Sequence, residues 1–104
     1  MGKLRPAFSK DGSVTAGSAS QISDGAAAMV MMRESTAKKL GVKPLARIVS
    51  HATHAQEPEW FSTAPIGATE KALEKAGWKV DDVDLWEINE AFAVVPMALM
   101  HDLK

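Results

Sequence analysis

Residues 84–93 read Asp84-Leu85-Trp86-Glu87-Ile88-Asn89-Glu90-Ala91-Phe92-Ala93, an apolar, strand-like run that ends at an asparagine just ahead of a helical pattern. From Val80 to Ile88 the apolar residues fall on both faces of the expected strand, which is typical of strands covered by helices on each side. Ligands of α/β sheets usually bind beyond the ends of such strands. The pattern therefore predicts a strand over 80–88 that delivers the Asn89 amide to the edge of a sheet.

Two earlier segments also have the composition of buried strands. Ala26 to Met32 is an unbroken apolar run, and Leu45 to Thr53 is a second stretch built around Ile48 and Val49. The polar residues 4–25 show no sustained period, and we expect an ordered loop with at most a short strand near its middle.

Two helices are expected between these strands. Glu34 to Leu40 is followed by Gly41, a residue type that commonly ends helices. From Pro65, a favoured first helical residue, small and apolar side chains recur at helical spacing until Gly77. These patterns predict a short first helix and a longer second one.

A third helix is expected where the apolar residues from Phe92 to Leu103 share one helical face. Pro96 limits its start, because proline in a helix interior costs roughly 3 kcal/mol but is tolerated in the first turn. We expect the helix to begin near Val94 or Val95 and residues 89–93 to form a turn.

The alternation of strands and helices predicts an α/β fold with a mainly parallel sheet and helices on both faces, incomplete in a chain of this length. The endings of the first two helices resemble each other, which indicates two similar halves. We place the boundary near Pro44, with 1–44 as the end of one half and 45–104 as the start of the next.

The composition excludes several classes of protein. With 104 residues, 46% hydrophobic content and a net charge of -1, the chain has apolar residues for a core and no basic stripe for nucleic acid. It has no apolar run long enough to cross a membrane and no signal peptide, so we expect a cytoplasmic location. The absence of cysteine rules out disulfides and thiolate zinc sites.

Asn89 has two interpretations. An asparagine between a strand and a helix is often a cap or turn residue that binds its own backbone. If the amide instead projects from the sheet edge, it can donate a hydrogen bond to developing negative charge, directly or through water. Glu90 could act as a base, although it and Glu87 more often serve as solvated groups.

Two other clusters favour simpler interpretations. Residues 15–26 mix small and hydroxyl side chains and allow a ligand to approach the backbone, but they lack the Gly-Lys-Ser/Thr ending of a P-loop. His51 and His54 would point to opposite faces of a strand, and no third ligand stands at a suitable spacing. No metal site is predicted.

Five separated motifs occur in order along the chain. They are Asp11-Gly12-Ser13-Val14-Thr15-Ala16-Gly17, Ser23-Asp24-Gly25-Ala26-Ala27-Ala28, Leu45-Ala46-Arg47-Ile48-Val49-Ser50, Lys71-Ala72-Leu73-Glu74-Lys75-Ala76-Gly77-Trp78 and Asn89-Glu90-Ala91-Phe92-Ala93. Together they resemble the thiolase family, most closely its acetyl-CoA acetyltransferase branch. The resemblance covers nearly the whole chain, and the ordered set is much more specific than any one motif.

This resemblance implies two similar α/β halves, assembly into dimers or tetramers, and either Claisen condensation of acetyl-CoA or thiolysis of 3-ketoacyl-CoA, as in fatty acid metabolism. In the family a cysteine takes the acyl group, while a histidine and a second cysteine handle activation and proton transfer. None of the three is recognisable here. The resemblance implies that the nucleophile lies before residue 1, that the other two lie after Lys104, and that this chain alone is inactive.

The remaining site residues follow from the resemblance position by position. Asn89 matches the asparagine that holds a water in the oxyanion hole, and Ser20 matches the serine that hydrogen-bonds the pantetheine arm of coenzyme A. Phe8, Ala16 and Phe92 match residues that line the tunnel for this arm, and Phe61 is a further substrate-binding position, where a phenylalanine would alter the shape of the pocket. Phe61 stands where short-chain enzymes often carry methionine. Acyl-CoA is the implied substrate, and no separate cofactor is implied.

In this interpretation the partners are acyl-CoA and the rest of a thiolase chain. The alternative is a non-catalytic module that binds the pantetheine arm, or a partner protein through the face of residues 92–103. The apolar strand at 26–32 would have unpaired edges in an isolated chain, which we expect to be poorly folded or self-associating.

Overall fold

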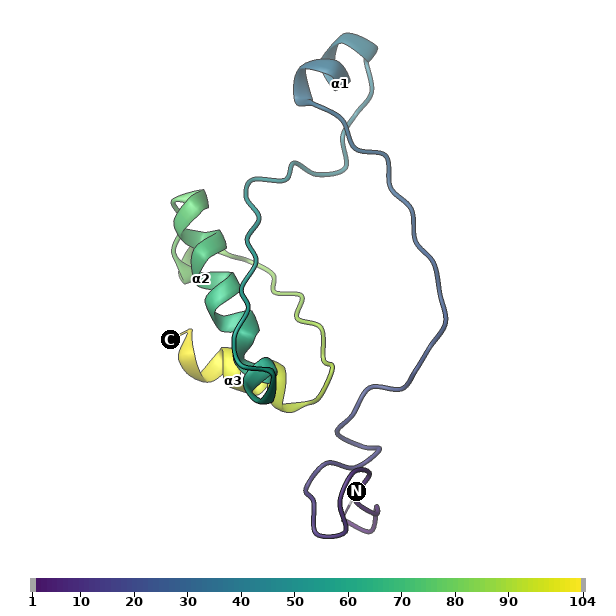
Figure 1. Ribbon diagram of the computed structural model, residues 1–104. Coiled ribbons are helices and arrows are strands. Elements are labelled where there is room, and N and C mark those ends of the chain that lie inside the picture. The colour runs from purple at the N-terminus through teal and green to yellow at the C-terminus, as the bar shows by residue number, and fades with distance from the viewer. Residues whose placement is uncertain (1, 104) are drawn as a thin grey trace.

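The structure is a computed structural model that describes residues 2–103 (Figure 1). Its helical elements, in chain order, are α1 (Glu34–Leu40), η1 (Pro58–Thr63), α2 (Ala64–Ala76), η2 (Val80–Asp82) and α3 (Val94–Asp102). The two η elements are 3-10 helices. Long extended segments connect these elements, and α1 stands apart from the others at the end of two such segments (Figure 1).

All three predicted α-helices are confirmed, and their ends follow from local chemistry. Gly41 and Gly77 end α1 and α2 with φ of 66° and 69°, the left-handed conformation that glycine adopts without strain. The third helix begins at Val94, which leaves Pro96 in its first turn and residues 89–93 outside it.

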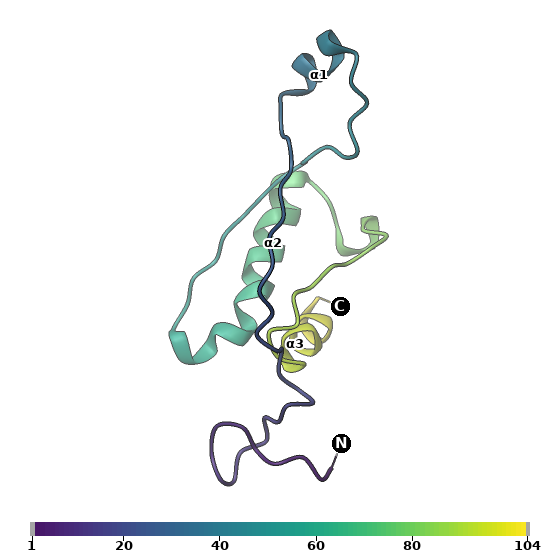
Figure 2. The ribbon, with the colours of Figure 1, turned by 90° about the vertical axis from the view of Figure 1, so that its right-hand side faces the viewer.

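The predicted strands do not form in the part of the chain that the structure describes. Residues 26–32 and 45–53 are extended without strand pairing, and 80–82 form η2 where a strand was expected to begin. The bridges among residues 2–103 are isolated ones, Pro6 with Thr15 and Ala19 with Phe92. A strand requires a neighbour in register, and these segments run as separate lines (Figures 1 and 2). No parallel sheet forms within the described residues.

The small core lies where α3 packs against η1 and α2 (Figure 2). Val95 and Leu99 of α3 are buried there, and Ala37 is buried within α1. The apolar segment 26–32 is uncovered, with Val30 89% exposed.

Two global quantities show how much surface is uncovered. The radius of gyration is 18.1 Å, against about 13 Å for a compact domain of this length. The accessible surface is 9461 Å², against about 5,700 Å² for a folded monomer of this mass. The chain is therefore an open arrangement, with apolar surface available for further packing.

Among residues 2–103, no helix combines the length and the apolar composition needed to cross a bilayer.

Candidate functional site

The turn at 89–93 is held against the loop at 18–20, from which it is far removed in sequence. Two backbone hydrogen bonds join the segments, from the Ser20 N–H to the Ala91 carbonyl (3.1 Å) and from the Ala93 N–H to the Ser18 carbonyl (2.9 Å). They flank the antiparallel bridge between Ala19 and Phe92. This pairing brings two of the predicted site segments into one place.

Ser20 adds a side-chain contact to the pairing. Its hydroxyl donates to the carbonyl oxygen of Glu90, 70 residues further along the chain. A serine hydroxyl has one proton to donate and two lone pairs to accept with. Because the proton is engaged by Glu90, Ser20 is left with acceptor capacity toward a ligand.

Ala16 lies in the tight turn that precedes this pairing. The Ser18 N–H donates to the Thr15 carbonyl at 3.0 Å, and the Thr15 N–H donates to the Ser18 hydroxyl oxygen at 3.1 Å. Ala16 is exposed at the tip of this turn. A small side chain at that point allows a ligand to approach the backbone closely.

Three phenylalanines form an aromatic cluster around Phe92. The Phe8 ring packs edge-on to Phe92 with centroids 6.1 Å apart and planes at 71°. On the η1 side, the Phe61 ring packs in the same manner at 5.9 Å and 61°. All three residues were predicted as substrate-binding positions, and the structure brings Phe8 and Phe61 into contact with Phe92. Phe61 is 50% exposed and Phe8 is 75% exposed, so the cluster presents apolar surface outward.

Asn89 does not act as a helix cap. The N-cap of α3 is Ala93, and no side chain caps that helix. The Asn89 side chain is exposed, and within residues 2–103 it makes no hydrogen bond. Its amide is thus available to a ligand or a water molecule. The neighbouring Glu90 is also exposed.

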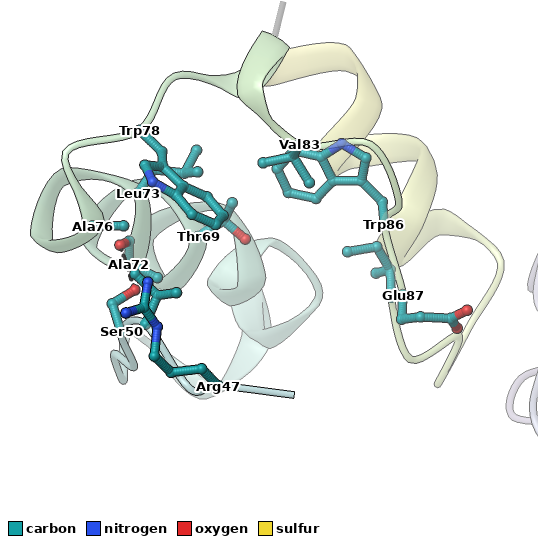
Figure 3. A pocket seen from close by; sticks show the side chains of 12 residues that line it. Arg47, Ser50, Thr69, Ala72, Leu73, Ala76, Trp78, Val83, Trp86 and Glu87 are labelled. Carbon is teal, nitrogen blue, oxygen red and sulfur yellow. Dashed lines mark hydrogen bonds between the residues drawn. The ribbon is translucent and has the colours of Figure 1, made fainter. Parts of the chain in front are cut away.

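Two hollows of the structure are lined mainly by other residues, although Glu90 lines one of them. One of 420 Å³ separates residues 47–50 and α2 from residues 83–88. Trp78 and Leu73 stand on one side of it and Val83 and Trp86 on the other, with open space between them (Figure 3). A second, of 450 Å³, lies between residues 86–88 with Glu90 and the side chains of Pro96, Leu99 and Met100 of α3 and of Leu103 just after that helix. Both are lined by apolar side chains of segments that were expected to be strands and of the neighbouring helices.

The two histidines of the 51–54 segment contact lysines of α2. The Lys75 ammonium donates to the His51 carbonyl at 3.1 Å, and the Lys71 ammonium lies 3.1 Å from Nδ1 of His54. In the described part of the chain, no group of three His, Cys, Asp or Glu side chains is placed to hold a metal ion. These histidines therefore join the segment to the helix in this structure.

Three participants in the site were not anticipated from the sequence. The Ser18, Glu90 and Ala91 carbonyls accept the hydrogen bonds that hold the two segments together. Every residue has a carbonyl, so no residue type marks these positions. The side-chain signal that was available is the run of small and hydroxyl residues at 15–20, which indicated close backbone approach.

Comparison with known proteins identifies the class. The family model for "Thiolase, C-terminal domain" matches residues 42–104, and the family model for "Thiolase, N-terminal domain" matches residues 1–35. The chain therefore belongs to the thiolase family.

Its relatives include an acetyl-CoA acetyltransferase of Allochromatium vinosum, 57% identical over 99% of this chain and 26% of the relative. A 3-ketoacyl-CoA thiolase of Marinobacter nauticus is 50% identical, and the match covers 100% of this chain and 27% of that thiolase. The crystal structure of human mitochondrial 3-ketoacyl-CoA thiolase in complex with CoA superposes with a TM-score of 0.91 at 44% identity, over 98% of this chain and 26% of that one. The arrangement of the chain is thus that of a thiolase segment, and it spans about a quarter of the length of these relatives.

Proposed function

We propose that this chain forms part of the active site of an acyl-CoA acetyltransferase. In this proposal Asn89 holds the oxyanion-hole water, and the rest of the thiolase polypeptide supplies the catalytic cysteine and histidine. The observation that carries it is the pairing of residues 18–20 with 90–93, which gathers Ser20 and Phe92 beside the exposed Asn89.

The substrate class in this proposal is a pantetheine thioester. Its arm would lie along the aromatic cluster (Phe8, Phe61 and Phe92), which offers edge-to-face rings and exposed apolar surface. Ala16 leaves room beside the arm, and Ser20 would accept a hydrogen bond from an amide N–H, since its own proton is engaged by Glu90. Acyl-CoA would be consumed as a substrate and not retained as a cofactor.

In acylation by acetyl-CoA, the cysteine thiolate attacks the thioester carbonyl, and the C–S bond then breaks to release coenzyme A as its thiolate. In thiolysis, the thiolate attacks the 3-keto carbonyl, and the C2–C3 bond breaks to release acetyl-CoA as an enolate. In both directions the thioester oxygen gains negative charge. A water held by the Asn89 amide would donate a hydrogen bond to that oxygen. Such donors stabilise the transition state more than the ground state, and loss of one lowers kcat by about 100-fold or more. Asn89 acts only on an oxyanion that the nucleophile creates, so this chain alone would not turn over.

The completed fold would contain the sheet that the described residues lack. We propose that residues 26–32, 45–53 and 83–88 become strands of a mainly parallel sheet, within halves divided near Pro44. Two observations support this proposal. Much apolar surface is exposed and available for further packing, and the open space between residues 47–50 and 83–88 leaves room for further strands (Figure 3). The family's dimeric or tetrameric assembly is part of the same proposal.

Thiolysis of acetoacetyl-CoA by the full-length polypeptide tests the function. Wild type should turn over, and Asn89→Ala should lose about 100-fold in kcat with a much smaller change in KM. Glu59→Gln, a change at an exposed position in η1, serves as the control. Equal kcat for Asn89→Ala and wild type would exclude an oxyanion role for this amide.

A further inference from the structure

The Asn89 side chain has no hydrogen bond of its own within residues 2–103, so its direction depends on how the turn backbone is held. Before the turn in sequence, residues 83–88 are extended and unpaired. After Asn89, α3 begins only at Val94, so neither a strand nor the helix holds the asparagine. In the described chain, the hydrogen bonds that hold residues 89–91 come from Ser20.

The three bonds of the pairing fix different parts of the turn. The two backbone bonds engage residues 91 and 93, toward the helix. The Ser20 hydroxyl engages the carbonyl of Glu90, the residue directly after Asn89. This bond therefore restrains the Glu90–Ala91 peptide group, which of the groups held by the pairing lies closest to the asparagine.

We propose that Ser20 is a positioning residue for Asn89, in addition to any contact it makes with substrate. By holding the Glu90 carbonyl, its hydroxyl restrains the backbone directly after Asn89 and so limits the directions in which the Asn89 amide projects. The inference rests on the proposed function, because it assigns Ser20 an effect on the oxyanion step as well as on binding. Small displacements of a catalytic group lower the rate steeply, so loss of one restraint should appear in kcat.

Kinetics of the full-length polypeptide separate the two roles. If Ser20 only bound the pantetheine arm, and bound it equally in the ground state and the transition state, its replacement by alanine would raise KM and leave kcat unchanged. A positioning serine would lower kcat. We expect Ser20→Ala to lower kcat about five-fold, the fold-change equivalent to one ordinary hydrogen bond. Ser20→Thr retains a hydroxyl donor and should restore most of that loss.

The decisive comparison is a double-mutant cycle with Asn89→Ala. If Ser20 acts through Asn89, Ser20→Ala should leave kcat unchanged once the amide is gone, while any effect on KM persists. Ser35→Ala, on exposed α1, is the matched control and should behave like wild type in both backgrounds. Circular dichroism of each variant checks that the fold is retained.

Two results would overturn the positioning role and leave the proposed function in place. One is a Ser20→Ala variant in which only KM changes, and the other is an equal loss of kcat from Ser20→Ala with and without Asn89. Poor folding of Ser20→Ala would leave Ser20→Thr as the deciding variant, and a five-fold loss of kcat there would also contradict the inference. Absence of wild-type turnover, or an Asn89→Ala variant as fast as wild type, would instead remove the proposed function and the positioning role with it.

Discussion

The Phe61 ring meets the Phe92 ring edge to face, with their centroids 5.9 Å apart and their planes at 61°. Phe61 belongs to η1, whereas Phe92 belongs to the turn that follows Asn89. The contact therefore joins the segment before α2 to the proposed catalytic turn. Edge-to-face pairs contribute about 0.5–1.5 kcal/mol beyond the area they bury.

Replacing Phe61 should change substrate binding more than the chemical step. In the full-length protein we expect Phe61→Ala to raise KM for acyl-CoA several-fold, because the aromatic cluster loses one wall, with kcat changed less. Phe61→Met is the matched variant, since it refills much of the volume with a flexible side chain, and its KM should lie closer to wild type. Steady-state kinetics with acetyl-CoA and longer acyl-CoA substrates measure both effects. Unchanged KM for Phe61→Ala with every substrate would remove this residue from the tunnel.

Gly67 is required by the close approach of His54. A Cβ built on Gly67 would lie 2.5 Å from Nδ1 and 2.9 Å from Cγ of the His54 ring. Alanine is normally about 1 kcal/mol better than glycine inside a helix, but here the ring would have to move and lose its contact with Lys71. We expect Gly67→Ala to lower the Tm of the full-length protein.

The matched comparison removes the ring. In a His54→Ala background, Gly67→Ala should raise the Tm, because the helix preference is then unopposed. Calorimetry of the four proteins measures the coupling between the two positions. The same rise in Tm from Gly67→Ala with and without His54 would refute the contact.

The local signals explain why the helices could be predicted and the strands could not. Gly41, Gly77 and Pro96 act within one turn of their own positions, so the helix ends follow from the sequence. A strand exists only when a second segment pairs with it, and residues 26–32 have no such neighbour within the described chain. The apolar pattern identified segments that need burial, but the burial itself depends on polypeptide other than these residues.

The candidate site was also predicted only in part from the sequence. The resemblance to thiolases pointed to Phe8, Phe61 and Phe92, which the structure brings into one cluster. Ser20 was singled out as a ligand contact, and its hydrogen bond to the Glu90 carbonyl was not foreseen. Backbone acceptors have no signature in the sequence, so a contact of this kind is found only from coordinates.

An isolated chain of residues 1–104 should neither catalyse thiolysis nor remain monomeric. Its accessible surface of 9461 Å² exceeds the roughly 5,700 Å² of a folded monomer of this mass, and the excess includes the apolar segment 26–32. We expect light scattering to show self-association and calorimetry to show no cooperative unfolding transition. A monomer with a sharp transition would be inconsistent with this prediction.

Glu34 and Lys38 form an ion pair of 2.8 Å across one turn of α1. The hydrogen bond from Lys38, followed by its charge, lowers the pKa of Glu34. Because the folded pKa is depressed, the contribution to stability is present above the unfolded value, about 4.3, and is lost as the pH falls below it. Both groups are exposed, so the effect should be small and weakened by salt. In the full-length protein, Glu34→Gln should reduce the difference in Tm between pH 6 and pH 3, conditions chosen around that value. An unchanged difference would show that the pair contributes nothing measurable.

The most direct test of the central claim is a crystal structure of the full-length polypeptide with acetyl-CoA bound. We predict a water molecule bonded to the Asn89 amide and to the thioester oxygen, with the pantetheine arm lying along Phe8, Phe61 and Phe92. Coenzyme A bound elsewhere, or an Asn89 amide turned away from the thioester and bonded to backbone, would contradict the account.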